Sequence, residues 1–456
     1  MEQLRQSPPD WEPVAATTDS DAPRVEEREA EGVAPEWGLA KRIVFRFLFS
    51  YLLLYNFPFP LDVVPTWSQL VLQPYTDLWN VLVPWVGKHV LGVEVLHRPG
   101  GSGDTTYNYV QLLCYVVIAL AATAVWTLLD RKRKSYARLD DWLRLYVRFV
   151  LVSAMIGYGM SKLIPVQMIE PWPSKLLQPI GDGSPMGLVW TFIGASVPYT
   201  MFSGAAELLA GFLLVARRTA LFGALVCTGV MANVVMLNFS YDVPVKLFSS
   251  HLLLMAVFLV LPDLKRIANL LMLNRPAPTA GLRPLLAGRR ARRAALVFQT
   301  AFVLLLTGTA LYQAYDALVQ YGDSAPKPKL YGIWEMEELA VDGAARPLLI
   351  TDKTLWRRIV FEWPGTIGVQ YMHETDVRYY GLKVDPGPHT FLLEPYGEDA
   401  GKKMAISYEL VQPDVLALDG EIDGKKIRAR LRRMDDSRFP LISRGFHWIN
   451  EWPLNR

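Results

Sequence analysis

Residues 107–134, YNYVQLLCYVVIALAATAVWTLLDRKRK, decide the fold of this chain. The first 23 of them (107–129) carry no ionised side chain and are long enough to cross the hydrocarbon core of a bilayer as a helix. Four basic residues in succession (131–134) follow, as is typical of the cytoplasmic end of a membrane-spanning helix. This stretch therefore predicts both a spanning helix and its direction.

Similar apolar segments recur throughout the chain before residue 322. The predicted spans are residues 42–58, 107–129, 145–164, 200–216, 219–239, 247–262 and 294–315. Another apolar stretch, Met186–Val197, precedes the fourth span and ends at Pro198, which predicts a partly inserted or broken helix. We therefore expect residues 39–321 to form a multi-pass α-helical membrane bundle of about seven helices.

Positive charge falls on one side of these spans if each of them crosses the membrane. The clusters are Lys41, Arg42 and Arg46; Arg131, Lys132, Arg133, Lys134, Arg138 and Arg144; Arg217 and Arg218; and Arg289, Arg290, Arg292 and Arg293. Because such clusters stay in the cytoplasm, we expect an inner (cytoplasmic) membrane protein with a cytoplasmic N-terminus and an extracytoplasmic C-terminus. Residues 1–38, rich in Pro, Glu, Asp and Ala, predict a disordered cytoplasmic head without a cleavable signal peptide.

The long outer loop, residues 59–106, contains a series of aromatic residues among Leu and Val. They are Trp67, Tyr75, Trp79 and Trp85. This series predicts an amphipathic helix at the membrane interface, where Trp and Tyr place their rings against lipid and their polar edges toward water. The helix is either a passive anchor or a lid over a cavity, and the frequency of aromatic belts in membrane proteins favours the anchor.

From Tyr331 onward the apolar pattern changes to a period of two, which is typical of strands. The alternating runs are residues 356–363, 367–371, 378–384, 389–394, 404–410, 415–419 and 426–432, separated by turn residues. We expect residues 322–456 to form an extracytoplasmic all-β domain, a small antiparallel barrel or sandwich.

The opening Gly332-Ile333-Trp334 of this domain resembles the Gly-x-Trp of lipocalin-like (calycin-like) barrels, in which the Trp plugs one end. A barrel of about eight strands holds one small ligand or is packed solid. The many aromatic residues here favour a packed interior.

Composition and motifs exclude several classes of function. The formal charge of +3 gives no sign of nucleic-acid binding. Two cysteines, Cys114 and Cys227, lie in apolar segments and cannot build a disulfide framework or a thiolate metal site. Six scattered histidines show no metal-ligand spacing, and there is no phosphate-binding, dinucleotide or nucleophile-elbow motif.

Polar side chains at membrane depth are costly and therefore mark candidate sites. The candidate polar pocket consists of Arg148, Lys162, Glu207, Asn233, Asn238, Asp242, Lys246 and His251. Glu207 lies among small residues that let a neighbouring helix come close, so its role is either to form a site or to make a structural ion pair with Lys162. Arg148 and Lys162 could instead extend to the headgroups. We expect Lys162 and the residues from Asn238 to His251 to gather at the outer end of the bundle.

Three places between Arg148 and Asp263 resemble the DoxX family of small four-helix membrane proteins. They are the helix from Arg148 to Gly157-Tyr-Gly-Met-Ser-Lys162, the stretch Glu207-Leu-Leu-Ala-Gly-Phe-Leu-Leu-Val-Ala-Arg217-Arg218, and the Ala- and Val-rich helix that follows. Arg148, Lys162 and Glu207 match the family's Arg, Lys and Glu one by one. The resemblance implies a DoxX-like core at about residues 145–265 and a link to redox chemistry, because family members are associated with thiosulfate:quinone oxidoreduction.

Two functions are expected from these observations. In the first, the bundle binds a quinone or another lipid-soluble molecule at the outer leaflet in a redox-linked role, and Glu207 and Lys162 set the charge of the pocket. In the second, the protein is a non-enzymatic membrane scaffold or envelope assembly factor whose outer domain binds a lipid or a membrane or periplasmic protein. Whether the chain is an enzyme stays open.

Overall fold

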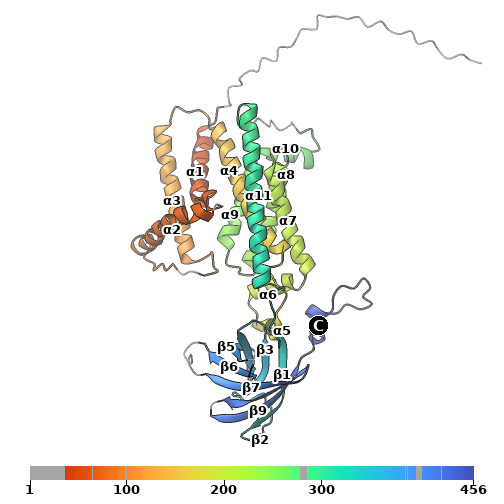
Figure 1. Ribbon diagram of the computed structural model, residues 1–456. Coiled ribbons are helices and arrows are strands. Elements are labelled where there is room, and N and C mark those ends of the chain that lie inside the picture. The colour runs from red at the N-terminus through yellow and green to blue at the C-terminus, as the bar shows by residue number, and fades with distance from the viewer. Residues whose placement is uncertain are drawn as a thin grey trace, which may run out of the picture.

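The computed structural model describes residues 36–455 except 64, 98–99, 278–284, 386, 388, 397–402 and 423, and for residues 65–69 it describes the backbone alone. The expected N-terminal head lies outside these residues apart from its last three. The described chain consists of a helical bundle followed by a β-barrel (Figure 1).

Seven helices are long and apolar enough to cross a membrane, which confirms the expected multi-pass bundle. They are α1 (Leu39–Asn56), α3 (Thr106–Leu129), α4 (Ala137–Leu163), α7 (Val197–Val215), α8 (Ala220–Ser240), α9 (Lys246–Val260) and α11 (Arg289–Gln320). A one-turn η4 (Leu261–Asp263) joins α9 to α10 (Leu264–Leu271). The helices run side by side, with the barrel at one end and the loop between α3 and α4 at the other (Figure 1). We call these the barrel end and the basic end.

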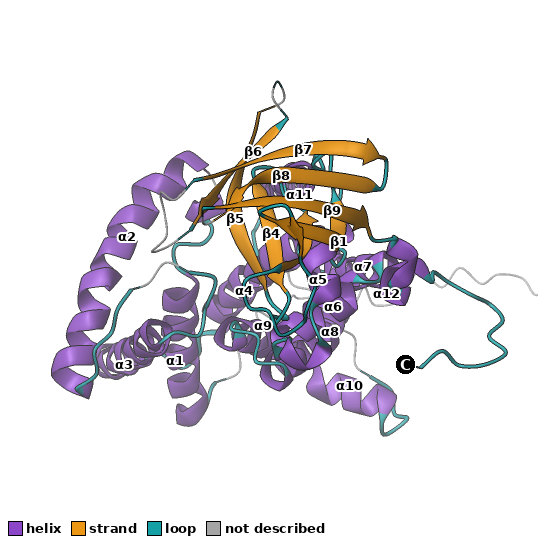
Figure 2. Ribbon diagram, turned by 90° about the horizontal axis from the view of Figure 1, so that it is seen from below, coloured by secondary structure: helices purple, strands orange, loops and turns teal. Residues whose placement is uncertain are grey.

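Three helices outside the seven candidate spans lie toward the barrel end of the bundle. They are α2 (Pro65–Val86), α5 (Pro173–Leu177) and α6 (Pro185–Gly194). The helix expected in the outer loop is α2, which runs across the direction of the bundle (Figures 1 and 2). Trp79 of α2 is buried against Tyr115 of α3, with ring centroids 4.8 Å apart, whereas Trp85 is exposed. The side chain of Trp67 is outside the described residues.

The broken helix expected before the fourth span is α6, whose ten residues are too few to cross the membrane. Its first turn is capped by Ser184, whose hydroxyl accepts a hydrogen bond from the Gly187 amide at 3.0 Å. Its last residue, Gly194, touches the backbone of Ile169, where a side chain would not fit. The first contact begins α6 at Ser184, and the second packs its end against the preceding loop.

Helices α4 and α7 approach each other closely because each presents a glycine to the other. A Cβ placed on Gly204 of α7 would lie 2.6 Å from the carbonyl oxygen of Gly159 in α4, and one on Gly159 would lie 2.9 Å from the Gly204 carbonyl oxygen. In lipid, helix association depends on such packing of small residues. The pair forms the centre of the larger helical group, α4 and α7–α9.

Gly204→Ala is expected to lower the melting temperature of the protein in detergent, because α4 and α7 must move apart to admit the new Cβ. Overpacking of this kind costs about 1–3 kcal/mol. Gly157→Ala on α4 is the matched control, since a Cβ there meets nothing within 4 Å. Equal melting temperatures for the two variants would contradict the close contact.

The C-terminal domain is a closed antiparallel barrel of eight strands, so of the two architectures expected the structure has the barrel. The strands are β1 (Gly332–Val341), β3 (Trp356–Phe361), β4 (Thr366–Tyr371), β5 (Val377–Asp385), β6 (Thr390–Pro395), β7 (Met404–Gln412), β8 (Val415–Ile422) and β9 (Lys425–Arg433). Each strand pairs with the next, and β1 also pairs with β9 in the register Trp334↔Arg433 to Val341↔Ile427, which closes the ring. A two-residue β2 (Ala344–Ala345) forms a hairpin with β1.

Apolar side chains occupy most of the barrel interior. Trp334 is 1% exposed and its indole nitrogen donates a hydrogen bond to the Leu330 carbonyl oxygen at 2.8 Å, so the ring is fixed at the end nearest the bundle. Phe361 and Phe391 fill the middle. A hollow of about 140 Å³ lies at the other end, lined by residues such as Ile422 and Ile427. The interior is therefore largely packed.

The barrel is attached to the bundle through the first turn of α5. The Glu362 carboxylate, which follows β3, accepts hydrogen bonds from the Ser174 amide and hydroxyl, both at 3.0 Å. The Tyr379 hydroxyl of β5 donates its hydrogen bond to Glu362 and lies 2.9 Å from the Ser174 hydroxyl. Burial and the hydrogen bond to Glu362 raise the pKa of the Tyr379 phenol, so it keeps the proton that it donates. Trp172 and Trp363 pack edge to face beside them.

Glu362→Ala is expected to speed hydrogen–deuterium exchange of the Ser174 amide about 10-fold or more, because the charged acceptor of that amide is lost. Exchange read by mass spectrometry on the full chain measures this. Glu337→Ala removes an acid of the barrel that pairs with Arg430 and Arg432 instead and serves as the control. Unchanged exchange at Ser174 in the first variant would refute this mode of attachment.

Candidate functional site

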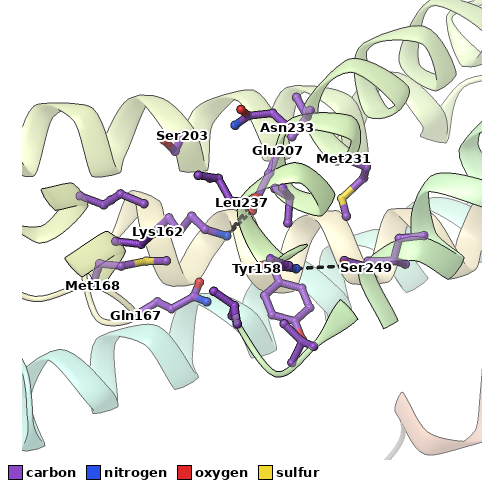
Figure 3. A pocket seen from close by; sticks show the side chains of 18 of the residues that line it. Tyr158, Lys162, Gln167, Met168, Ser203, Glu207, Met231, Asn233, Leu237 and Ser249 are labelled. Carbon is purple, nitrogen blue, oxygen red and sulfur yellow. Dashed lines mark hydrogen bonds and ion pairs between the residues drawn. The ribbon is translucent and has the colours of Figure 1, made fainter. Parts of the chain in front are cut away.

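A cavity of about 530 Å³ opens among α4, α6, α7, α8 and α9 at the barrel end. Most of its lining is apolar, including Met155, Trp190, Phe248 and Leu252. The polar groups lie on different elements and face the same space: Lys162 on α4, Gln167 in the loop after it, Ser203 and Glu207 on α7, Asn233 and Asn238 on α8, and Ser249 on α9 (Figure 3). A mainly apolar cavity with a few convergent polar groups is typical of a ligand site.

Lys162 and Glu207 form an ion pair in the wall of this cavity. The Lys162 ammonium lies 2.9 Å from both carboxylate oxygens of Glu207, and the two side chains are only 11% and 4% exposed (Figure 3). Lys162 is in the last turn of α4 and Glu207 in the middle of α7, and the Gly159–Gly204 contact brings their helices within reach. The predicted pairing is therefore present, and its members also line the cavity.

The Lys162–Glu207 pair can still form a hydrogen bond to a ligand. An ammonium group has three donors, and the two oxygens of Glu207 engage two of them. The Tyr158 ring, 5.5 Å from the ammonium nitrogen, covers another side of it. The pair can thus donate one further hydrogen bond to an oxygen atom in the cavity, and the carboxylate can accept a proton from a group placed there.

The two asparagines of α8 differ in their surroundings. Asn238 is buried and its amide donates a hydrogen bond to the Ser249 hydroxyl at 2.9 Å, which ties α8 to α9. Asn233 lines the cavity as an exposed residue and makes no hydrogen bond to the part of the chain that the structure describes. Asn233 is therefore the amide that is available to a ligand.

Four residues of the predicted pocket lie elsewhere, which corrects that part of the prediction. Arg148 precedes Lys162 by 14 residues, or about 21 Å along α4, and its guanidinium lies near the Phe149 ring. Asp242 and Lys246 pair with each other at 2.7 Å in the turn before α9, outside the cavity. His251 faces the opposite side of α9, toward α1, where it bonds Tyr51.

A comparison with curated proteins finds the Bacillus subtilis (strain 168) protein named "Uncharacterized protein YwoB". It is 32% identical to this chain over 119 residues, which are 26% of this chain and 75% of YwoB. The chain belongs to the same family as YwoB. The name of YwoB states no activity, so membership of the YwoB family does not by itself assign one here. No protein-family model matches the chain, and no solved structure matches it.

The shared part is a minority of this chain. Because 119 residues make up three quarters of YwoB, that protein is much shorter, and this member of the YwoB family carries substantial sequence beyond the matched residues.

Sequence reasoning missed several residues of the site. Gln167 and Trp190 lie in a loop and in the short α6, where no spanning-helix argument draws attention to a polar or aromatic residue. Asp104 was also missed: its two carboxylate oxygens accept hydrogen bonds from the Lys246 and Leu247 amides at 2.7 and 2.9 Å. It caps α9 from the end of the outer loop, and only its place just before α3 could have drawn attention to it.

Lys162→Met is expected to destabilise the protein by about 3–5 kcal/mol, because it leaves the Glu207 carboxylate buried without its counter-charge. Lys162→Met combined with Glu207→Gln should recover much of that loss, since no isolated charge remains. Unfolding in detergent, followed through alkylation of the buried Cys227, measures the double-mutant cycle. Strictly additive losses would show that the two groups do not interact.

Proposed function

We propose that this protein is an inner-membrane member of the YwoB family that binds a quinone or a similar lipid-soluble molecule in a redox-linked role. The buried Lys162–Glu207 pair in the wall of an apolar cavity is the observation that carries this proposal. A ring oxygen of such a molecule accepts a hydrogen bond from the remaining N–H of the Lys162 ammonium group. The apolar lining of the cavity surrounds the ring and part of the tail. The resemblance of Arg148, Lys162 and Glu207 to the DoxX pattern supports the same role.

We also propose an orientation of the protein in the membrane. The basic clusters lie at the end of the bundle opposite the barrel, and such clusters stay in the cytoplasm (Figure 1). The N-terminus is then cytoplasmic, while the barrel and the cavity face the outer leaflet. Reduction of a quinone needs two electrons and two protons. The electrons would come from a membrane or periplasmic protein partner, and both protons would come from water at the outer face and pass through the Lys162–Glu207 pair to the ring oxygens.

The β-domain supports a second candidate, a non-enzymatic scaffold or assembly factor. The barrel interior is largely filled by residues such as Trp334 and Phe391, so recognition by this domain would use its outer surface. In that case the cavity in the bundle would be occupied by lipid alone, and the outer domain would hold a protein or lipid partner.

Glu207→Gln is expected to lower the affinity of the full chain in nanodiscs for decyl-ubiquinone at least 10-fold, because the ammonium of Lys162 loses the anion that orients it. Asp77→Asn on α2, an exposed acid far from the cavity, should leave affinity unchanged. Equilibrium dialysis with empty nanodiscs as a blank measures both. Equal affinities would overturn the proposal. A partner protein that co-purifies with the Glu207→Gln variant, without any bound quinone in the parent, would favour the scaffold.

A further inference from the structure

A second cavity, of about 560 Å³, lies at the barrel end on the other side of α9, among α1, α3, α4 and α9. Tyr158, Phe248 and Leu252 line both cavities and form the wall between them. Neither Lys162 nor Glu207 lines the second cavity. It is therefore a separate space, and its chemistry does not depend on the ion pair.

His251 is held in one tautomer at the edge of this cavity. Its Nδ1 lies 2.6 Å from the Leu247 carbonyl oxygen, which can only accept, so Nδ1 carries the proton of the neutral ring. Nε2 is then the acceptor, and the Tyr51 hydroxyl donates to it at 2.5 Å. The imidazole is stacked on the Tyr55 ring, with centroids 3.9 Å apart and an interplanar angle of 9°. Together these contacts build a flat and rigid aromatic surface.

Four polar groups of the lining have no hydrogen-bond partner among the described residues. They are the Tyr55 hydroxyl on α1, the Gln111 amide on α3, and the Ser153 and Tyr158 hydroxyls on α4. A polar group left without a partner away from water is costly, and an occupant of the cavity that bonds to it removes that cost. Three helices thus present unused donors and acceptors to one space.

The charge of the lining limits what can occupy it. No Lys or Arg is among the described residues that line this cavity, whereas the acidic Asp62 is. A phosphate or carboxylate would therefore meet no cation and one carboxylate. A ligand that is purely hydrocarbon would leave the polar groups of Tyr55, Gln111 and Ser153 without a hydrogen-bond partner. An uncharged, flat molecule that carries oxygen atoms able to donate and accept hydrogen bonds fits both the aromatic surface and these unpaired groups.

We propose that this second cavity is a binding site for an uncharged aromatic ring bearing a hydroxyl or ring carbonyl group. The ring lies against the Tyr55–His251 surface, and its oxygen bonds to the Gln111 amide and the Tyr55 hydroxyl. The site does not need the proposed function to hold, since neither Lys162 nor Glu207 lines it and the groups that would bond the ring, Tyr55 and Gln111, do not line the first cavity.

Three probes with one ring system test the proposal on the full chain in nanodiscs: 1-naphthol, naphthalene and 1-naphthyl phosphate. Wild type should bind 1-naphthol about 5- to 10-fold more tightly than naphthalene, the ratio expected for one net hydrogen bond, and should not bind the phosphate. Partition into empty nanodiscs is subtracted.

Gln111→Leu with Tyr55→Phe should reduce 1-naphthol affinity to the level of naphthalene while leaving the melting temperature unchanged, because neither polar group has a partner to lose. Asn233→Leu, in the first cavity, is the control and should leave 1-naphthol affinity as it is. Unchanged affinity in the double variant, loss in Asn233→Leu alone, binding of the phosphate, or no binding beyond empty nanodiscs would each overturn the proposal. Failure of Glu207→Gln to affect decyl-ubiquinone would leave it standing.

Discussion

Backbone contact between α4 and α7 is the interaction on which the rest of the bundle depends. With glycine at 159 and 204, the helices are near enough for an ammonium on one to reach both oxygens of a carboxylate on the other. An ion pair in a low-dielectric interior is favourable only when its geometry is this good, because both groups lose their hydration. The small residues therefore allow a buried charge pair, and the charge pair in turn gives an otherwise apolar cavity its polar wall.

The segment between α4 and α7 connects this cavity with the barrel. Gln167 and Met168, at its start, line the cavity, and Ser174, a few residues later, is held by Glu362 of the barrel. Farther along the same segment, Trp190 of α6 also lines the cavity. The segment that supplies Gln167, Met168 and Trp190 to the cavity wall is therefore the one that the barrel holds at Ser174.

Much of the fold could be predicted because its signals are local. Runs of apolar residues, basic clusters at their ends and the change to a period of two at Tyr331 each depend on neighbours in the chain. The Lys162–Glu207 pair was also within reach, since two opposite charges at similar depth have few other partners. The rotation of each helix about its own axis was not, because it depends on packing. This is why His251 faces α1. The distance of Arg148 from Lys162 follows instead from their separation along α4, which the sequence alone shows. The cap that Asp104 supplies to α9 joins residues far apart in sequence, with no local pattern to indicate it.

These distant caps have a consequence for biogenesis. Asp104 is synthesised 142 residues before the Lys246 amide that it caps, so its carboxylate is already in place when α9 leaves the ribosome. Glu362 is synthesised 188 residues after Ser174, so the first turn of α5 gains this acceptor only once β3 has been made and has folded. The helices can insert before the barrel exists, but the segment that carries α5 is fixed last. Until β3 has folded, the Ser174 amide and hydroxyl have no acceptor from the barrel, which distinguishes newly made from mature molecules.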